Sequence, residues 1–140
     1  MKKRIETTHT LNANLDQVWN NVRTGAEWER WLPILSGSTI NGEGKGAKRV
    51  CQMHDGNELF ETILESDDEQ KLFQYRIDKQ SFMPISDVIG TMKFSGKNGE
   101  TKLEWNVEFE VENEETFEQV KPGIEEIYST SSSKLAELSI

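Results

Sequence analysis

The sequence predicts an α+β domain in which a curved antiparallel sheet of about seven strands packs against a long C-terminal helix. Three observations lead to this prediction. Apolar and polar residues alternate along several stretches, so that each stretch has one apolar face. Two Gly-containing turns join such stretches as hairpins, and the last part of the chain changes to a helical period. At 140 residues, the chain is expected to form a single domain over 1–140.

The first expected element is a strand over residues 2–11. One side of it carries Ile5, Thr7, His9 and Leu11, a pattern typical of a half-buried strand. A helix with Asn14 as its N-cap follows, and its apolar face consists of Leu15, Val18, Trp19 and Val22. Gly25 ends this helix. A second short helix is expected to reach Trp31, because Pro33 disfavours helical geometry at the residue before it.

From Gly37 onward the period is two, and about six further strands are expected. The turn "HDGN" separates "AKRVCQM" from "ELFETILE", and its Asp-Gly pair is a strong hairpin signal. A further strand is "KLFQYRID". The turn "SGKNGE" joins "ISDVIGTMKF" to "TKLEWNVEFEV" as a second hairpin. Glycines at 42, 44 and 46 are expected to let the chain turn from helix into sheet.

The last expected element is a helix capped by Asn113. Its apolar residues keep a period near 3.6, namely Phe117, Val120, Ile124, Ile127, Tyr128, Leu135 and Leu138. A helix of about 25 residues would extend for about 37 Å. Pro122-Gly123 interrupts the pattern, so either a kink or a restart at Pro122 is expected. Because each strand has one apolar face, the helix is expected to cover that face of the sheet.

Composition limits the expected partners. A formal net charge of −9 disfavours nucleic acid and anionic lipid surfaces. The single cysteine suits a reducing compartment, and neither a signal peptide nor an apolar run of about 20 residues is present. A cytoplasmic protein without membrane insertion is therefore expected. Neither a metal nor another cofactor is expected, since metal-ligand spacings and a phosphate-binding loop are missing.

A series of motifs resembles the START-like superfamily (SRPBCC, the birch-pollen-allergen fold), and within it the polyketide cyclase/dehydrase-like branch. They are "ANLDQVWNNV", Trp28 with "WLP", "GKGAKRV", "FETILESDDE", "YRI", "GTMKF", "GETKLEWNVEF" and "KLAEL". The resemblance covers nearly the whole chain and implies a helix-grip fold with a cavity between sheet and C-terminal helix. It also implies that Trp19, Trp28 and Trp31 plug the end supported by the short helices, with a ligand contact by Trp31 as the alternative.

Arg49 and Glu61 are the first candidates for ligand contact. A two-residue Asp55-Gly56 loop would pair Arg49 with Thr62 and send Glu61 to the opposite face. A three-residue loop over 55–57 would place on one face Arg49, Cys51, Met53, Leu59, Glu61 and Ile63. The resemblance favours the second register, with Arg49 diagonal to Glu61. The pair would then hold a ligand hydroxyl or carbonyl, move protons, or only fix the sheet register.

Two side chains are weak catalytic candidates, Glu61 and, as a proton shuttle, His9. Cys51 is expected to be an inert small hydrophobe, and Ser131 either leaves room for a ligand or packs closely on the sheet. The predicted ligand-binding set is Arg49, Cys51, Met53, Leu59, Glu61, Tyr75, Ile77, Val88, Met92, Trp105, Val107, Ile124, Ile127 and Tyr128, with Phe109 beside them. An apolar lining with a few polar groups is typical of a small-molecule site, and core packing alone is the competing interpretation.

The function expected is binding of a small hydrophobic or aromatic molecule in the central cavity. One alternative is a cyclase or dehydratase acting on a polyketide-like substrate, with Glu61 or His9 moving protons. Another is a co-chaperone-like interaction module, which one START-like branch resembles and which requires a large exposed apolar patch. The expected partner is a small hydrophobic molecule and not a nucleic acid, and a homodimer is one option.

Overall fold

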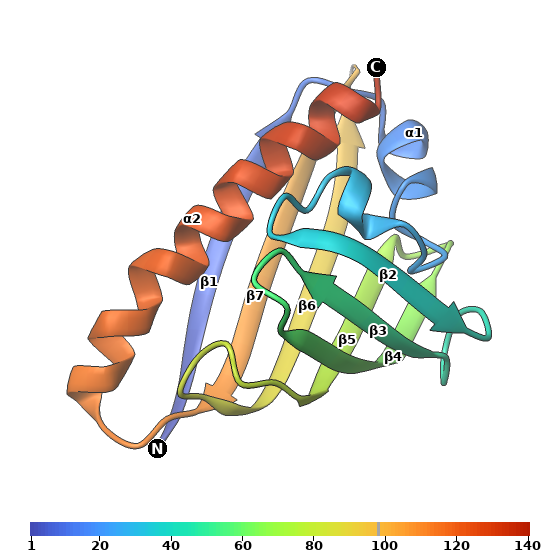
Figure 1. Cartoon of the computed structure of the whole chain (residues 1–140). Coiled ribbons are helices and arrows are strands. Elements are labelled where there is room, and N and C mark those ends of the chain that lie inside the picture. Colours follow the sequence, from blue (N-terminus) through green and yellow to red (C-terminus); the bar gives the residue numbers. More distant parts are fainter. Residues whose placement is uncertain (98) are drawn as a thin grey trace.

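The computed structural model describes residues 1–97 and 99–140, so Asn98, within the expected "SGKNGE" turn, lies outside the described residues. One antiparallel sheet of seven strands curves around a long helix (Figure 1). The strands lie in the order β1-β7-β6-β5-β4-β3-β2. Their bounds are Lys2–Leu11, Leu35–Asn41, Lys48–Met53, Glu58–Asp67, Leu72–Lys79, Ser86–Lys97 and Glu100–Glu110 for β1 to β7. The predicted fold class is confirmed.

The helices follow the prediction in position but differ in length. α1 covers only Leu15–Asn20, and the second short helix is a single 3₁₀ turn, η1, at Trp28–Arg30. α2 covers Glu114–Leu138 and begins at Asn113, whose side chain accepts a hydrogen bond from the Thr116 backbone N–H at 2.8 Å. The helix continues through Pro122 without a restart, as one unbroken ribbon in Figure 1.

The glycine-rich segment has a different role from the one predicted. Gly42, Gly44 and Gly46 lie between β2 and β3, with φ angles of 98°, 70° and 91°. This left-handed region favours glycine because it lacks a Cβ atom. The glycines therefore reverse the chain from strand to strand, whereas the passage from η1 into the sheet takes place before them, where β2 starts at Leu35.

The core lies between the concave face of the sheet and the helices. Trp19, Trp28 and Trp31 are all buried, as predicted. The Trp28 ring centroid lies 4.8 Å from that of Trp31 and 4.9 Å from that of Phe73. Trp31 also reaches Trp105 on β7, at 6.1 Å between centroids. Aromatic clusters of this kind bury large areas and favour tilted or edge-on contacts, so the short helical segments are fixed to one end of the sheet.

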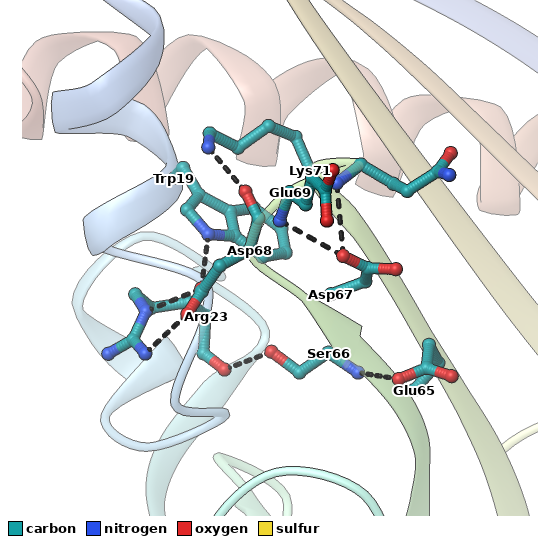
Figure 2. A network of polar contacts seen from close by, with 9 residues as sticks. Trp19, Arg23, Glu65, Ser66, Asp67, Asp68, Glu69 and Lys71 are labelled. Atoms are coloured by element: carbon teal, nitrogen blue, oxygen red, sulfur yellow. Dashed lines mark hydrogen bonds and ion pairs between the residues drawn. The ribbon is translucent and has the colours of Figure 1, made fainter.

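A polar network at the β4–β5 turn fixes the same end of the sheet from outside (Figure 2). The Trp19 indole N–H donates to Asp68 Oδ1 at 2.8 Å, and Arg23 donates to both oxygens of that carboxylate at 2.8 and 2.9 Å. The hydrogen bond from Arg23, followed by that from Trp19, holds the pKa of Asp68 well below its usual range. The Ser66 hydroxyl donates to the Arg23 carbonyl oxygen, which adds a second tie between the α1 segment and β4.

The convex face of the sheet is polar where β1 meets β7. There Arg4 forms an ion pair with Glu108 at 3.3 Å. The exposed large hydrophobic residues among those described are Met1, Phe60, Phe82, Leu138 and Ile140. They come from the two termini, one strand and one loop, and so do not favour the interaction-module alternative. No helix within the described part of the chain is long and apolar enough to cross a membrane.

Candidate functional site

A cavity of about 100 Å³ lies between the concave face of the sheet and α2. Since one water needs roughly 10–15 Å³ measured in the same way, the space suits several waters or one compact organic molecule. Most of the predicted ligand-binding residues line it, namely Arg49, Cys51, Leu59, Glu61, Tyr75, Ile77, Val88, Trp105, Val107, Ile124, Ile127 and Tyr128. The structure therefore brings these residues of the sheet and of α2 together around one space.

The other lining residues were not predicted. They are Trp28, Leu32, Ile34, Leu35, Gln80, Phe82, Met83 and Ile85. Most come from the η1–β2 connection and from the loop between β5 and β6. The available signal was the apolar stretch "FMP", which lies between the predicted strands and belongs to neither of their periods. Apolar residues in such a loop need a surface to cover, and here they cover the cavity.

Gln80 holds the β5–β6 loop in shape. Its side-chain N–H₂ donates to the carbonyl oxygens of Met83 and Ile85 at 2.8 and 2.9 Å, and its side-chain oxygen accepts from the Met83 backbone N–H at 2.8 Å. A surface groove between α2 and the two loops shares with the cavity Ile34, Phe82, Met83 and Ile127. A second groove, beside β5 and β6, shares with the cavity Ile77, Gln80, Ile85 and Val88.

Several predicted residues lie away from the cavity. Met53 and Met92 are buried in the core but do not line it, and the same is true of Phe109 and Trp31. His9 is half-buried on β1, and its ring Nε2 lies 2.9 Å from Thr7 Oγ1. Because the Thr7 hydroxyl donates its proton to the Trp105 carbonyl oxygen, we assign the Nε2–H tautomer to His9. Burial lowers the pKa of this histidine.

Arg49 and Glu61 are direct cross-strand partners in the structure. The face that the three-residue loop predicts for them is right, but the register differs. The Met53 N–H donates to the Asn57 carbonyl oxygen at 2.9 Å, so the loop residues are His54, Asp55 and Gly56. The shift moves Glu61 from the diagonal position to the position opposite Arg49. Gly56 takes the left-handed conformation, φ 92°, which closes this turn.

The Arg49 side chain is enclosed on all sides. Its Nε donates to Glu61 Oε1 at 2.7 Å, and its Nη1 donates to the Gly25 carbonyl oxygen at 2.8 Å. The guanidinium carbon lies 4.0 Å from the centroid of the Trp28 ring, a favourable cation–π distance. Burial opposes the charge on Arg49, but the neighbouring Glu61 carboxylate outweighs burial, so that the pKa of Arg49 is raised.

Glu61 uses only one of its two oxygens for the protein. Oε1 accepts from Arg49 and also from the Cys51 thiol, at 3.2 Å between sulfur and oxygen. Among the described residues none donates to Oε2, and the only fully enclosed side-chain polar atoms without a partner are the hydroxyls of Ser131 and Ser132. Because Oε2 is not among those enclosed atoms and Glu61 lines the cavity, we infer that Oε2 is open to that space.

The Cys51 thiol remains protonated in this setting. Burial raises the pKa of Cys51, and the Glu61 carboxylate raises it further. A thiol in this state is a poor nucleophile. Cys51 therefore acts as a small donor to Glu61, and the predicted inert character of this cysteine agrees with its environment.

An aromatic wall faces the Arg49–Glu61 pair. Trp105 and Tyr128 stack with ring centroids 3.9 Å apart and planes 8° from parallel, and the Trp105 indole N–H donates to the Tyr75 hydroxyl oxygen at 3.2 Å. Burial raises the pKa of Tyr75 and of Tyr128, so both hydroxyls are protonated near neutral pH. The wall thus combines flat apolar surface with neutral hydroxyl groups.

Gly90 on β6 makes room for this wall. It pairs with Tyr75 on β5, and a Cβ atom added to Gly90 would lie only 2.2 Å from Cζ of the Tyr75 ring. The ring therefore rests on the bare backbone of its neighbour strand, a close approach that requires glycine. Because Tyr75 lines the cavity, its close packing on Gly90 keeps the ring out of that space.

Metal ligation finds no support in the residues that the structure describes. Within 1–97 and 99–140, no group of three His, Cys, Asp or Glu side chains gathers in an arrangement that could hold a metal ion. The side chains with polar atoms that line the cavity are Arg49, Cys51, Glu61, Gln80, the tyrosines Tyr75 and Tyr128, and the tryptophans Trp28 and Trp105.

Comparison with known proteins places the chain within one family. The family model "Polyketide cyclase / dehydrase and lipid transport" matches residues 2–139. No curated protein sequence matches the chain. Among solved structures, the protein XoxI from Bacillus cereus is similar with a TM-score of 0.82 and 21% identity, over 96% of this chain and 93% of that chain.

Two solved enzymes have the same fold. The Zhui aromatase/cyclase from Streptomyces sp. R1128 matches with a TM-score of 0.82 and 15% identity, over 99% of this chain and 94% of that chain. Norcoclaurine synthase from Thalictrum flavum, solved with dopamine and hydroxybenzaldehyde, matches with a TM-score of 0.71 and 19% identity, over 96% and 86%. At such identities the likeness concerns the fold and not the activity.

Proposed function

The chain belongs to the polyketide cyclase/dehydrase and lipid transport family, and we propose that it binds a small hydrophobic or aromatic molecule in the cavity between its sheet and α2. Ligand contact would come from the Arg49–Glu61 pair, from the aromatic wall of Tyr75, Trp105 and Tyr128, and from the apolar side chains around them. Cavities in this fold family are expected to hold small molecules, which agrees with the lining found here.

One observation carries the proposal: the lining is mostly apolar, and its only charged groups are a buried ion pair whose carboxylate keeps one oxygen without a donor among the described residues. Arg49 is 1% exposed and Glu61 5% exposed. Placing two charges in such surroundings is costly, and leaving a carboxylate oxygen without a donor adds to that cost. A ligand that fills the space and satisfies this oxygen would offset part of the cost.

The proposal can be tested with toluene, a probe small enough for a cavity of about 100 Å³. Two-dimensional ¹H–¹⁵N NMR of the labelled protein is expected to show saturable shifts at cavity residues such as Val88, Val107 and Ile124. Ile127→Trp should abolish them, because Ile127 lines the cavity and the larger side chain would fill much of its small volume. Glu125→Trp, an exposed change on the same helix, is the matched control and should bind as the wild type does.

Two outcomes would contradict the proposal. The first is that the wild-type protein shows no saturable shifts with toluene. The second is that the Ile127→Trp variant binds toluene as well as the Glu125→Trp variant does. The second outcome would place the binding site outside the cavity. Circular dichroism of both variants verifies that each is folded before binding is compared.

A second candidate function is cyclisation of a polyketide-like substrate. The observation that favours it is the free Glu61 Oε2 over apolar space, where a carboxylate can take a proton from a methylene flanked by two carbonyl groups. Glu61→Gln should then abolish product formation from a linear poly-β-ketone mimic while toluene binding persists. His9 does not share this cavity and has no role in the proposed step.

A further inference from the structure

The polar atoms of the cavity lining differ in how many hydrogen bonds they already make within the protein. Glu61 Oε1 already accepts two hydrogen bonds, from Arg49 and from Cys51. Arg49 donates from Nε to Glu61 and from Nη1 to the Gly25 carbonyl oxygen, while its Nη2 makes no hydrogen bond with the described residues. Glu61 Oε2 accepts none from the described residues and faces the cavity. A ligand therefore meets an acceptor whose hydrogen bond is still to be made, beside a cation that is already neutralised.

The cavity has no net charge. Arg49 and Glu61 are the charged side chains among its lining residues, and they form an ion pair at 2.7 Å. A carboxylate ligand would bring a second anion next to Glu61 in surroundings of low polarity, where like charges repel strongly. It would also compete with Glu61 for Arg49. An ammonium ligand would meet the Arg49 charge in the same way.

A hydrocarbon ligand has no hydrogen-bond donor and therefore leaves Glu61 Oε2 without a partner. A neutral hydroxyl does satisfy it, because one O–H can donate to a carboxylate oxygen while its own oxygen still accepts. Hydrogen bonds to a charged partner are stronger than neutral ones. The protonated hydroxyls of Tyr75 and Tyr128 lie on the same lining and offer further neutral partners.

We propose that the cavity selects a neutral aromatic alcohol, of which a simple phenol is the smallest example, and that Glu61 Oε2 determines this specificity by accepting the ligand hydroxyl. The ring of such a ligand would take the apolar space beside Trp105 and Val107. Carboxylates of the same shape are rejected by the Glu61 charge. This inference rests on the proposed function and specifies the chemical class of its ligand.

A matched series of three probes tests the inference: toluene, 4-methylphenol and 4-methylbenzoate. They share one ring and one methyl group and differ only in the polar group. At pH 7 the structure leads us to expect that 4-methylphenol binds about tenfold or more tightly than toluene, because of the hydrogen bond to a charged acceptor. 4-Methylbenzoate should bind more weakly than toluene. Dissociation constants come from the NMR titration described above.

The Glu61→Gln variant should change the affinities for the anion and for the phenol in opposite directions, which a merely structural role of Glu61 would not produce. Removing the negative charge leaves the Arg49 charge without its counter-ion, so 4-methylbenzoate should bind more tightly to this variant while 4-methylphenol binds about tenfold more weakly. Glu58→Gln removes an exposed carboxylate from the same strand and should leave all three affinities unchanged. If Glu61→Gln does not fold, the ranking of the three probes in the wild-type protein decides the matter.

The outcomes separate this inference from the proposed function. If toluene binds but 4-methylphenol binds no better, or if 4-methylbenzoate binds best, the specificity inference is overturned and cavity binding stands. If none of the three probes binds the wild-type protein, both are overturned. A ranking of phenol above toluene above benzoate, reversed for the anion by Glu61→Gln, supports the inference.

Discussion

Arg49 on β3 stands directly opposite Glu61 on β4, and the two buried side chains meet through a hydrogen bond of 2.7 Å between Nε and Oε1. Each charge is tolerated only because the other is present. The pair therefore couples the stability of the sheet to the chemistry of the cavity.

Breaking the pair from one side should be far more harmful than replacing both partners. Arg49→Met leaves Glu61 as an uncompensated buried charge and should lower the free energy of unfolding by about 3–5 kcal/mol. Adding Glu61→Leu to that variant should restore much of the loss, because an apolar pair carries no desolvation cost. Urea denaturation of both single variants and the double variant measures the coupling. Additive effects of the two changes would contradict it.

Gly90→Ala should destabilise the protein by about 1–3 kcal/mol, the usual cost of overpacking a core. The new methyl group would lie 2.2 Å from Tyr75 Cζ, so the ring must move toward the cavity. Gly37→Ala is the control, because its nearest neighbour outside the adjoining residues is the Gln52 side-chain oxygen at 3.4 Å. Thermal unfolding of both variants tests this. A Gly90→Ala variant as stable as Gly37→Ala would show that Tyr75 is free to shift.

Asp68 should contribute to stability in a pH-dependent manner. Its pKa in the folded protein is lowered by the hydrogen bonds from Arg23 and Trp19, from a usual value of 3.8. The contribution of Asp68 to the free energy of unfolding is therefore complete above the usual pKa of 3.8 and is lost as the pH falls toward the lower pKa of the folded protein. The difference in stability between wild type and Asp68→Asn should be constant from pH 5 to 7 and shrink below about pH 4.

The neighbouring turn offers the control for Asp68. Glu69 is exposed, and its side chain makes no hydrogen bond or ion pair with the described residues. Glu69→Gln should show no such change with pH. A stability difference for Asp68→Asn that grows as the pH falls would have the wrong sign and would exclude the network as its source.

Ser131→Ala should stabilise the protein by about 1 kcal/mol. The Ser131 hydroxyl is buried on α2 without a hydrogen-bond partner among the described residues, and alanine both removes this unsatisfied group and favours the helix. Ser133→Ala, at an exposed position of the same helix, gains only the helix preference and is the matched comparison. Equal effects at the two sites would mean that the Ser131 hydroxyl is satisfied in solution.

Strand alternation predicted most of the fold, because the side-chain period of a strand is fixed at two. The common face of Arg49 and Glu61 followed from the register that the family resemblance favoured, since a two-residue loop would have placed them on opposite faces. The register itself depended on turn geometry, and the sequence allowed several loops around Asp55-Gly56. The loop consists of residues 54–56 instead of 55–57, with Gly56 in the left-handed conformation. The partner of Arg49 is therefore Glu61 and not Ile63, a shift of two residues that keeps the face.

Cavity membership was less predictable. Met92 shares a strand face with Val88, yet only Val88 lines the cavity, because alternation specifies the face and not the depth along the strand. The β5–β6 loop was missed altogether, since Phe82 and Met83 belong to no periodic pattern. Gln80 and Met83 shape this loop through hydrogen bonds in both directions, a local irregular turn that neither a helical nor a strand period signals.

The stacking of Trp105 on Tyr128 gives the molecule a built-in optical reporter. Both rings line the cavity, and Trp105 lies within a chain of ring contacts that continues through Trp31 to Trp28. Rigid aromatic rings in a fixed asymmetric setting produce the near-ultraviolet circular dichroism of a folded protein. Occupation of the cavity will therefore alter a spectrum that the native chain generates unaided, so ligands of unknown identity can be sought without a label.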